Sequence, residues 1–310
     1  MNTAIEWTDA TWNPVRGCER ISPGCVNCYA ERTAMRFSGK GQPYEWLVQI
    51  TNGHPRWTGK ISCIPEKLKE PLGWKQPRRV FVNSMSDLFH DGVPEEFINR
   101  VFAVMALACR HTFQVLTKRP DRMLREMMRL AKNIKPLEEA ARELGYTFKF
   151  QDHSLLPWPI PNVWLGVSVE SQKYADERIP LLLQTPAAIR FLSVEPLLES
   201  VDIRRYLRCT ECGGDGFQDY GVPCFCGGER GVDLVICGGE SGPGARPFNL
   251  AWAEYLLKQC RAAGTKFFMK QLGANAGYIS QGKWVNYRTK SKGGDMSEWP
   301  ESIRVREFPA

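Results

Sequence analysis

The chain has 310 residues, with 41 Lys and Arg against 34 Asp and Glu and a formal net charge of +7. Its 43% hydrophobic and 24% charged residues exclude a disordered chain and are enough for a sizeable core. No apolar stretch approaches the roughly 18–20 residues of a membrane span. The N-terminal residues 1–9 lack the basic and apolar regions of a signal peptide. We therefore expect no membrane residence and no export.

Short apolar runs alternate with helical patterns along the chain. Strands are predicted near residues 11–13, 79–84, 112–117, 162–169, 189–194, 233–237 and 265–269, and helices over 94–109, 120–132, 174–183 and 250–263. Such alternation is typical of parallel strands joined by crossover helices. The expected fold is α/β, a partial (β/α) barrel of about six to seven parallel strands.

Two regions depart from this alternation. Residues 203–232 are rich in Gly and Cys and are predicted to be a small metal-binding insertion. After Gly273 the chain turns polar and aromatic-basic, without clear periodicity. We therefore expect a barrel domain over 1–273 that contains the insertion, and a C-terminal extension over 274–310.

The predicted strands end in polar residues or glycines. Because functional groups of α/β barrels lie at the carboxyl ends of the strands, these exits are candidate ligand contacts. The candidates are Ser84, Ser86, Asp87, Lys118, Ser168, Glu170, Ser193, Glu195, Gly238, Gly239 and Glu240. The alternative is that strand ends simply meet polar loops.

One predicted helix also carries a row of arginines, Arg122, Arg125 and Arg129, on one face. This row could bind phosphate groups, or it could be a solvated helix face.

Seven of the 11 cysteines fall in two groups, and in a chain without an export signal grouped cysteines point first to metal binding. Cys18, Cys25 and Cys28 lie within eleven residues after the first predicted strand. Three thiolates leave one position open, as in a 4Fe–4S cluster with one free iron. The alternatives are zinc with a distant fourth ligand, for which His54 and Cys63 are nearest, and no metal.

The second group consists of Cys209, Cys212, Cys224 and Cys226. Four cysteines in a short Gly-rich segment are typical of a structural zinc knuckle, which stabilises a loop too small to build its own core. An auxiliary iron–sulfur cluster and no metal are the alternatives.

The three-cysteine loop followed by strand–helix units resembles the radical S-adenosylmethionine superfamily. More closely, the chain is similar to a phage- and prophage-associated three-Cys-motif family. This similarity rests on residues 5–14, 22–31, 85–89, 117–120 and 238–243, and it extends over about residues 4–273. The cysteine spacing here, C-x6-C-x2-C, departs from the common C-x3-C-x2-C, and an aromatic residue follows Cys28 instead of preceding it.

This resemblance implies a cluster on Cys18, Cys25 and Cys28 that reductively cleaves S-adenosylmethionine to a 5′-deoxyadenosyl radical, which abstracts hydrogen from a substrate. It implies that Asp87 contacts the amino group of the methionine part, with capping of the local chain as the alternative role. Gly238 and Gly239 are candidates for the adenine side because glycine allows close backbone approach. The other strand-exit residues are candidates for ribose, carboxylate or substrate contacts.

The resemblance further implies an isomerase or lyase that modifies DNA, rearranging a hypermodified pyrimidine in phage DNA. An electron donor such as flavodoxin or ferredoxin, and a cytoplasmic location in a bacterial cell or phage-infected host, follow from the same reading. The enzymatic alternative is a radical lyase that repairs a DNA photoproduct. The non-enzymatic alternative is a nucleic-acid-binding protein stabilised by zinc at both cysteine groups.

Overall fold

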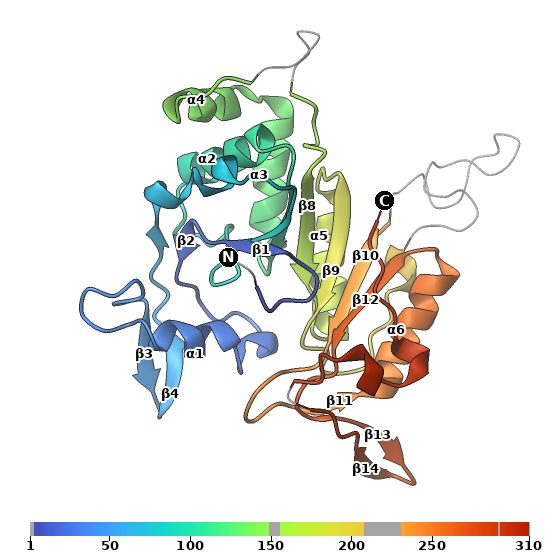
Figure 1. Cartoon of the computed structure of the whole chain (residues 1–310). Helices are drawn as coiled ribbons and strands as arrows, with labels where there is room; N and C mark the ends of the chain where they lie inside the picture. The colour runs from blue at the N-terminus through green and yellow to red at the C-terminus, as the bar shows by residue number, and fades with distance from the viewer. Residues whose placement is uncertain (1–2, 149–155, 208–230, 291, 310) are drawn as a thin grey trace, which may run out of the picture. The chain divides into compact units, whose positions relative to one another are not determined.

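The structure is a computed structural model that describes residues 3–148, 156–207, 231–290 and 292–309. Seven parallel strands form its main sheet, in the order β1-β6-β7-β8-β9-β10-β12 (Figure 1). The strands are β1 (Ala10–Trp12), β6 (Arg79–Val82), β7 (Thr112–Thr117), β8 (Val163–Ser168), β9 (Ile189–Val194), β10 (Leu234–Gly238) and β12 (Lys266–Gln271). The predicted α/β fold, a partial (β/α) barrel, is confirmed.

The four helices that the sequence predicts are present as α2 (Glu95–Leu107), α3 (Pro120–Lys132), α5 (Gln172–Gln184) and α6 (Leu250–Ala262). The described residues also form α1 (Tyr29–Met35) and α4 (Lys135–Glu143). Every residue of β8 and β10 is buried, as expected for parallel strands that are covered on both faces. Among the described residues, none of these helices combines the length and the apolar character that crossing a membrane requires.

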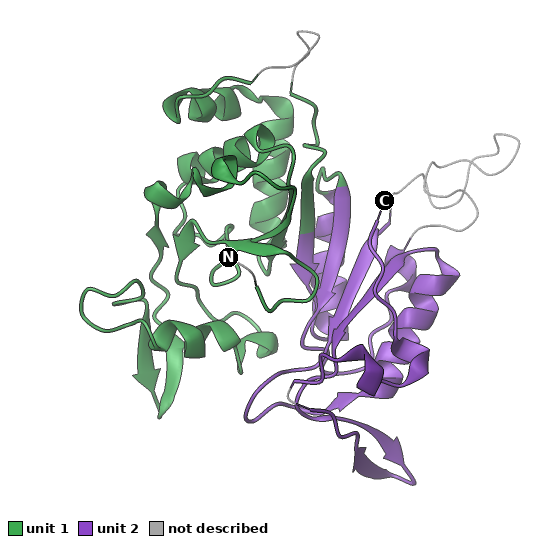
Figure 2. Ribbon diagram, viewed as in Figure 1, with its two compact units in different colours: residues 1–165, 185–188 green, residues 166–184, 189–310 purple. Residues whose placement is uncertain are grey.

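The chain divides into two compact units (Figure 2). Unit 1 consists of residues 1–165 and 185–188, and unit 2 of residues 166–184 and 189–310. The boundary falls within β8. In unit 1, Trp12 lies against Phe113 with ring centroids 5.8 Å apart, and α2 packs on α4 through Ala103, Ala140 and Ala141.

Unit 1 also contains two strand pairs that the sequence analysis did not predict. β2 (Val15–Arg16) pairs with β5 (Ser62–Cys63), and β3 (Val48–Thr51) pairs with β4 (His54–Trp57). Asn52 and Gly53 connect β3 to β4 with positive φ angles of 50° and 74°. Asn-Gly is the preferred sequence for such a two-residue hairpin turn, so the signal for this hairpin is present in the sequence.

In unit 2 the residues after Gly273 are ordered into strands. β13 (Ala276–Ser280) pairs with β14 (Lys283–Asn286) in a hairpin, and β11 (Phe248–Asn249) runs parallel to β13. The final segment lies along β12, where the Met269 amide donates to the Val305 carbonyl and the Glu307 amide donates to the Phe267 carbonyl. This segment covers the edge of β12, which would otherwise present unpaired backbone groups.

Candidate functional site

The first cysteine group lies in unit 1, on the loop between β2 and α1. Gly17 opens this loop with a φ of +87°, and a Cβ atom there would collide with the Lys60 carbonyl, so the position requires glycine. Cys18, Cys25 and Cys28 are partly buried and free of disulfides. Cys28 directly precedes the first residue of α1.

The three thiols influence one another electrostatically. Burial, reinforced by the charge of Asp87, raises the pKa of Cys18 to about 12, with a further contribution from Cys28. Burial also raises the pKa of Cys28, to which Cys25 and Glu31 add. Cys18 and Cys25 therefore each lie close enough to Cys28 to perturb it or be perturbed by it.

An arginine holds this loop in place. Arg20 donates through Nε to Oε1 of Glu31 at 2.8 Å, pairs with Oε2 of the same carboxylate, and donates to the Val26 carbonyl at 2.7 Å. Glu31 is almost fully buried and also accepts from the Trp57 amide at 3.0 Å. The loop is thereby tied to α1 and to β4. The sequence analysis assigned no role to Arg20 or Glu31.

The exits of β6 and β7 meet beside the cysteine loop, because β1, β6 and β7 are neighbours in the sheet. Asp87, which follows β6, is buried and accepts four hydrogen bonds of 2.8–3.1 Å, from the Phe89 amide, Thr117 Oγ1, the Lys118 amide and Arg119 Nη1. Both carboxylate oxygens thus bind this chain's own groups. One of these bonds, from the Phe89 amide, is local, and the other three join Asp87 to the exit of β7.

Arg119 is a third residue to which the sequence analysis assigned no role. Its buried guanidinium lies 3.1 Å from Asp87 Oδ2 and 3.8 Å from Glu19 Oε2. His90 lies nearby, with Nε2 3.9 Å from Glu19 Oε2 and Nδ1 accepting from the Gly92 amide at 3.0 Å. Burial and the Arg119 charge lower the pKa of His90, which favours the neutral ring.

The remaining candidates of unit 1 lie at the same exits. Ser84 Oγ donates to Asn13 Oδ1 at 3.1 Å, and Ser86 Oγ donates to the Val15 carbonyl at 2.8 Å, so both serines fasten the β6 exit to the segment after β1. The Lys118 amide donates a hydrogen bond to Asp87, and Lys118 is partly buried.

The predicted arginine row on α3 is not a single surface. Arg122 is buried and pairs with the His90 and Val93 carbonyls, whereas Arg125 is exposed. Arg122 is therefore neither part of a phosphate-binding row nor part of a solvated face. Tertiary contacts cover its side chain, and helical periodicity does not reveal such contacts.

In unit 2 the exit of β8 carries a buried ion pair. Glu170 is fully buried, and its Oε2 lies 3.0 Å from Nη1 of Arg178, which also donates to the Ser168 carbonyl at 2.8 Å. Glu170 and Ser168, two predicted ligand contacts, therefore position α5 against the strand exit.

The exits of β9, β10 and β12 converge within unit 2. Ser193 Oγ donates to Glu195 Oε2 at 3.2 Å, and Lys270 Nζ lies 3.1 Å from Glu195 Oε1. A Cβ atom on Gly238 would come within 2.7 Å of the same Oε1 atom. This part of the site thus presents a partly buried ammonium and a carboxylate side by side.

The next two candidates after β10 have structural partners. A Cβ atom on Gly239 would collide with the Leu272 carbonyl, so this glycine permits close approach of two chain segments. Glu240 forms a paired contact with Arg246, whose Nη2 lies 2.7 Å from Oε1 and whose amide donates to Oε2 at 2.9 Å. This pair closes the loop between β10 and β11.

Cys209, Cys212, Cys224 and Cys226 lie outside the described residues. Within the described part of the chain, no three or more His, Cys, Asp or Glu side chains converge as a single ion requires. The thiolates of a four-iron cluster bind separate iron atoms and do not need to converge on one point.

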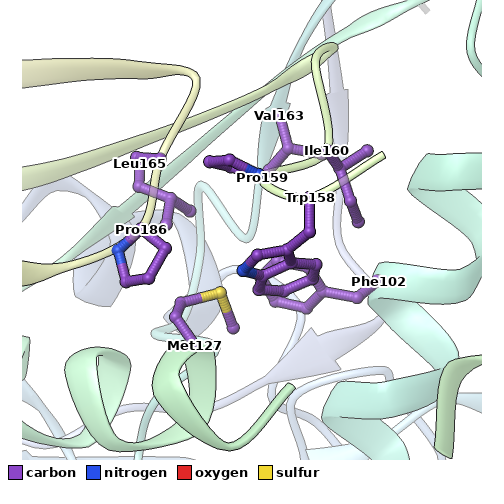
Figure 3. A pocket seen from close by; sticks show the side chains of 9 residues that line it. Phe102, Met127, Trp158, Pro159, Ile160, Val163, Leu165 and Pro186 are labelled. Carbon is purple, nitrogen blue, oxygen red and sulfur yellow. The ribbon is translucent and has the colours of Figure 1, made fainter. Parts of the chain in front are cut away.

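A small hollow in unit 1 is lined by apolar side chains (Figure 3). Its walls are formed by Phe102, Met127, Trp158, Pro159, Ile160, Val163, Leu165, Pro186 and Ala187. The cavity measures about 10 Å³, room for about one water molecule, and is too small for a cofactor.

Comparisons with known proteins place the chain in a family. Neither the curated proteins nor the solved structures include a match to it. A family model with the description "Protein of unknown function (DUF5131)" matches residues 2–300, which is nearly the whole chain. The protein is therefore a member of the DUF5131 family.

Proposed function

We propose that this protein is a radical S-adenosylmethionine enzyme whose 4Fe–4S cluster is held by Cys18, Cys25 and Cys28. The observation that carries the proposal is the trio of free thiols on one loop, electrostatically linked through Cys28. Burial disfavours bare thiolates at Cys18 and Cys28, and a bound cationic group would compensate for their charge.

The donor set fits a cluster with one open iron. Cys63, one of the two nearest candidates for a fourth ligand, has a pKa raised by burial alone, without a contribution from the other thiols. Three thiolates leave one iron free for the amino and carboxylate groups of S-adenosylmethionine. When bound, such a cluster supplies the electron that cleaves the sulfonium bond and so initiates hydrogen abstraction.

The chain's own residues would hold the reactants in register. Arg20 and Glu31 keep the cysteine loop closed, and Asp87 fixes the exits of β6 and β7. For unit 2, we propose that Glu195 and Lys270 bind polar groups of the cofactor or the substrate, because their charged ends are only partly buried. Glu170 and Glu240 instead form ion pairs with Arg178 and Arg246, and these pairs fix the chain segments around them.

For the substrate we propose a modified pyrimidine in DNA, which the enzyme would rearrange as an isomerase. The net charge of +7 supports a polyanionic partner. The reaction would need an electron donor such as flavodoxin or ferredoxin and would take place in the cytoplasm of a bacterial cell or phage-infected host. We propose zinc for the second cysteine group.

The first test is metal content and low-temperature electron paramagnetic resonance of anaerobically reconstituted, dithionite-reduced protein. About four irons per chain and a signal that changes on addition of S-adenosylmethionine are expected. Zinc alone would favour a zinc-stabilised nucleic-acid-binding protein, and an iron signal indifferent to S-adenosylmethionine would contradict the proposed radical chemistry.

The second test separates isomerase from photoproduct lyase. The loaded enzyme is incubated with DNA containing modified pyrimidines and with ultraviolet-irradiated DNA, and the released nucleosides are compared by mass spectrometry and chromatography. An isomerase changes the retention of a nucleoside without changing its mass. A lyase restores ordinary thymidine from the photoproduct.

A further inference from the structure

We propose that unit 1 binds the sugar–phosphate backbone of DNA through Lys75, Arg78 and Arg110, which gather around Trp74 at the amino ends of β6 and β7. These four residues are called the basic surface below. The inference rests on the proposed function for the choice of DNA as the polyanion, and it does not depend on the iron–sulfur cluster.

One indole ring brings the cations of the basic surface together. The guanidinium carbon of Arg78 lies 5.5 Å from the centroid of the Trp74 ring, and Arg110 Nη1 donates to the Trp74 carbonyl at 3.5 Å. Lys75 follows Trp74 directly in the chain. The indole also contacts the interior, since the centroid of the buried His111 ring lies 5.7 Å from its own. Two chain segments that are distant in sequence therefore meet at a fixed place.

The charges of the basic surface are not compensated internally. In the part of the chain that the structure describes, no Asp or Glu forms an ion pair with Lys75, Arg78 or Arg110. By contrast, Arg79, the residue after Arg78, pairs with Asp9 at 3.4 Å. Cations that gather on one surface without counterions attract a polyanion and raise its local concentration.

The residue types and their exposure suit the phosphate groups of a polymer. Arginine binds phosphate through its planar fork, and lysine binds it as a point charge. Lys75 and Arg110 are exposed, and Arg78 is partly buried. An open surface of this kind fits an extended backbone better than a single small anion. Contacts to the backbone position DNA without reading its sequence.

The basic surface lies at the opposite end of the strands from the cysteine loop. Arg78 directly precedes β6 and Arg110 lies just before β7, whereas Asp87 follows β6. The six residues of β7 span about 20 Å at roughly 3.3 Å per residue. A duplex that rises about 3.4 Å per base pair covers this length in about six base pairs. The basic surface would therefore hold backbone at a distance from the reacting nucleotide.

The test measures how DNA binding depends on salt. The full chain, with and without anaerobic loading of iron and sulfide, is titrated into a labelled duplex of about 20 base pairs at several salt concentrations, and binding is followed by fluorescence anisotropy. Wild type is compared with Lys75→Gln, Arg110→Gln, Arg110→Lys and Arg125→Gln, and thermal unfolding checks that each variant is folded. Arg125 is the matched control, because it is an exposed arginine of unit 1 outside the basic surface.

Lys75→Gln and Arg110→Gln are each expected to lower the slope of log Kd against log salt concentration by about 0.9 and to raise Kd about fivefold at roughly 0.15 M salt. Arg110→Lys keeps the charge and should keep the slope. Arg125→Gln removes the same charge from the chain but should change neither quantity. The losses should be equal for duplexes of different sequence, because the contacts are to phosphate groups.

The outcomes separate this inference from the proposed function. Absence of salt-dependent DNA binding by wild type, or equal losses for Arg125→Gln and Arg110→Gln, overturns the basic surface. Displacement of the duplex by millimolar inorganic phosphate at constant ionic strength identifies a small-anion site and also overturns it. Iron content and the cofactor-dependent resonance signal decide the radical chemistry separately. A chain that binds DNA through Lys75 and Arg110 but holds no iron supports the basic surface and contradicts the proposed enzyme.

Discussion

Arg178 Nη1 lies 3.0 Å from Glu170 Oε2, and both side chains are almost completely withdrawn from solvent. The guanidinium carbon also lies 4.1 Å from the centroid of the Tyr174 ring. Glu170 follows β8 and Arg178 lies in the middle of α5, so this ion pair connects a strand exit to the helix that comes after it.

Breaking this pair from one side is expected to destabilise the protein strongly. Glu170→Gln or Arg178→Met should lower the free energy of unfolding by about 3–5 kcal/mol, because each leaves a buried charge without its partner. The double variant should lose less than the sum of the two single losses. Urea unfolding at neutral pH measures all three variants.

The matched control lies on the same helix. Lys173 and Glu177 form an exposed pair at 3.8 Å, so Lys173→Met should change stability by only about 0–1 kcal/mol. Equal losses for Lys173→Met and Arg178→Met would show that burial does not set the strength of these pairs.

The effect of a cysteine substitution on bound iron should depend on which cysteine is replaced. Cys18→Ala, Cys25→Ala and Cys28→Ala are each expected to reduce bound iron to below a tenth of the wild-type amount and to abolish the cofactor-dependent resonance signal, because a cluster with two thiolates is poorly held. Cys109→Ser is the control, since Cys109 is exposed and isolated in sequence from both groups. Loss of iron in Cys109→Ser would contradict the assignment of the ligands.

Gly239 offers a test of backbone packing. Gly239→Ala forces a methyl group onto the Leu272 carbonyl, and overpacking of this kind costs about 1–3 kcal/mol. Gly73→Ala is the comparison, because a Cβ atom at Gly73 meets no other atom within 4 Å. Thermal unfolding should therefore show a lower midpoint for Gly239→Ala only.

Acid stability should depend on His111. Burial lowers the pKa of this ring below its ordinary 6.5, and its Nε2 atom lies 3.1 Å from the Pro71 carbonyl. The unfolded chain therefore binds a proton at this ring more readily than the folded chain does. The free energy of unfolding decreases as the pH drops from 6.5 toward the lowered pKa of the folded state. His111→Gln should weaken this loss between pH 7.5 and 5.5, as measured by urea unfolding. A pH dependence identical to that of wild type would exclude His111 as a source.

Hydrophobic periodicity and strand composition were sufficient to predict the strands of the main sheet. β8 and β10 are continuous apolar runs, and such runs favour a doubly covered parallel sheet whatever their neighbours. The hairpin at Asn52–Gly53 was also open to prediction, because its turn chemistry is local. The hairpin at Gln281–Gly282 carries a weaker signal, since glutamine seldom takes the positive φ of 49° found there.

The partners of the candidate site residues were not open to prediction in the same way. Asp87 binds Arg119 across two strand exits, and Glu170 binds Arg178 eight residues later. A sequence shows that a carboxylate follows a strand, but its partner depends on how loops fold back in three dimensions. A polar residue at a strand exit therefore does not by itself distinguish a ligand contact from an internal ion pair.

The contacts of Glu31 have a consequence for the order in which the protein is assembled. Arg20, the Trp57 amide and Arg56 converge on this carboxylate, so contacts within the polypeptide shape the loop that carries the three thiols. For the proposed cluster, this predicts that protein synthesised under iron starvation folds first and acquires its iron and sulfide afterwards.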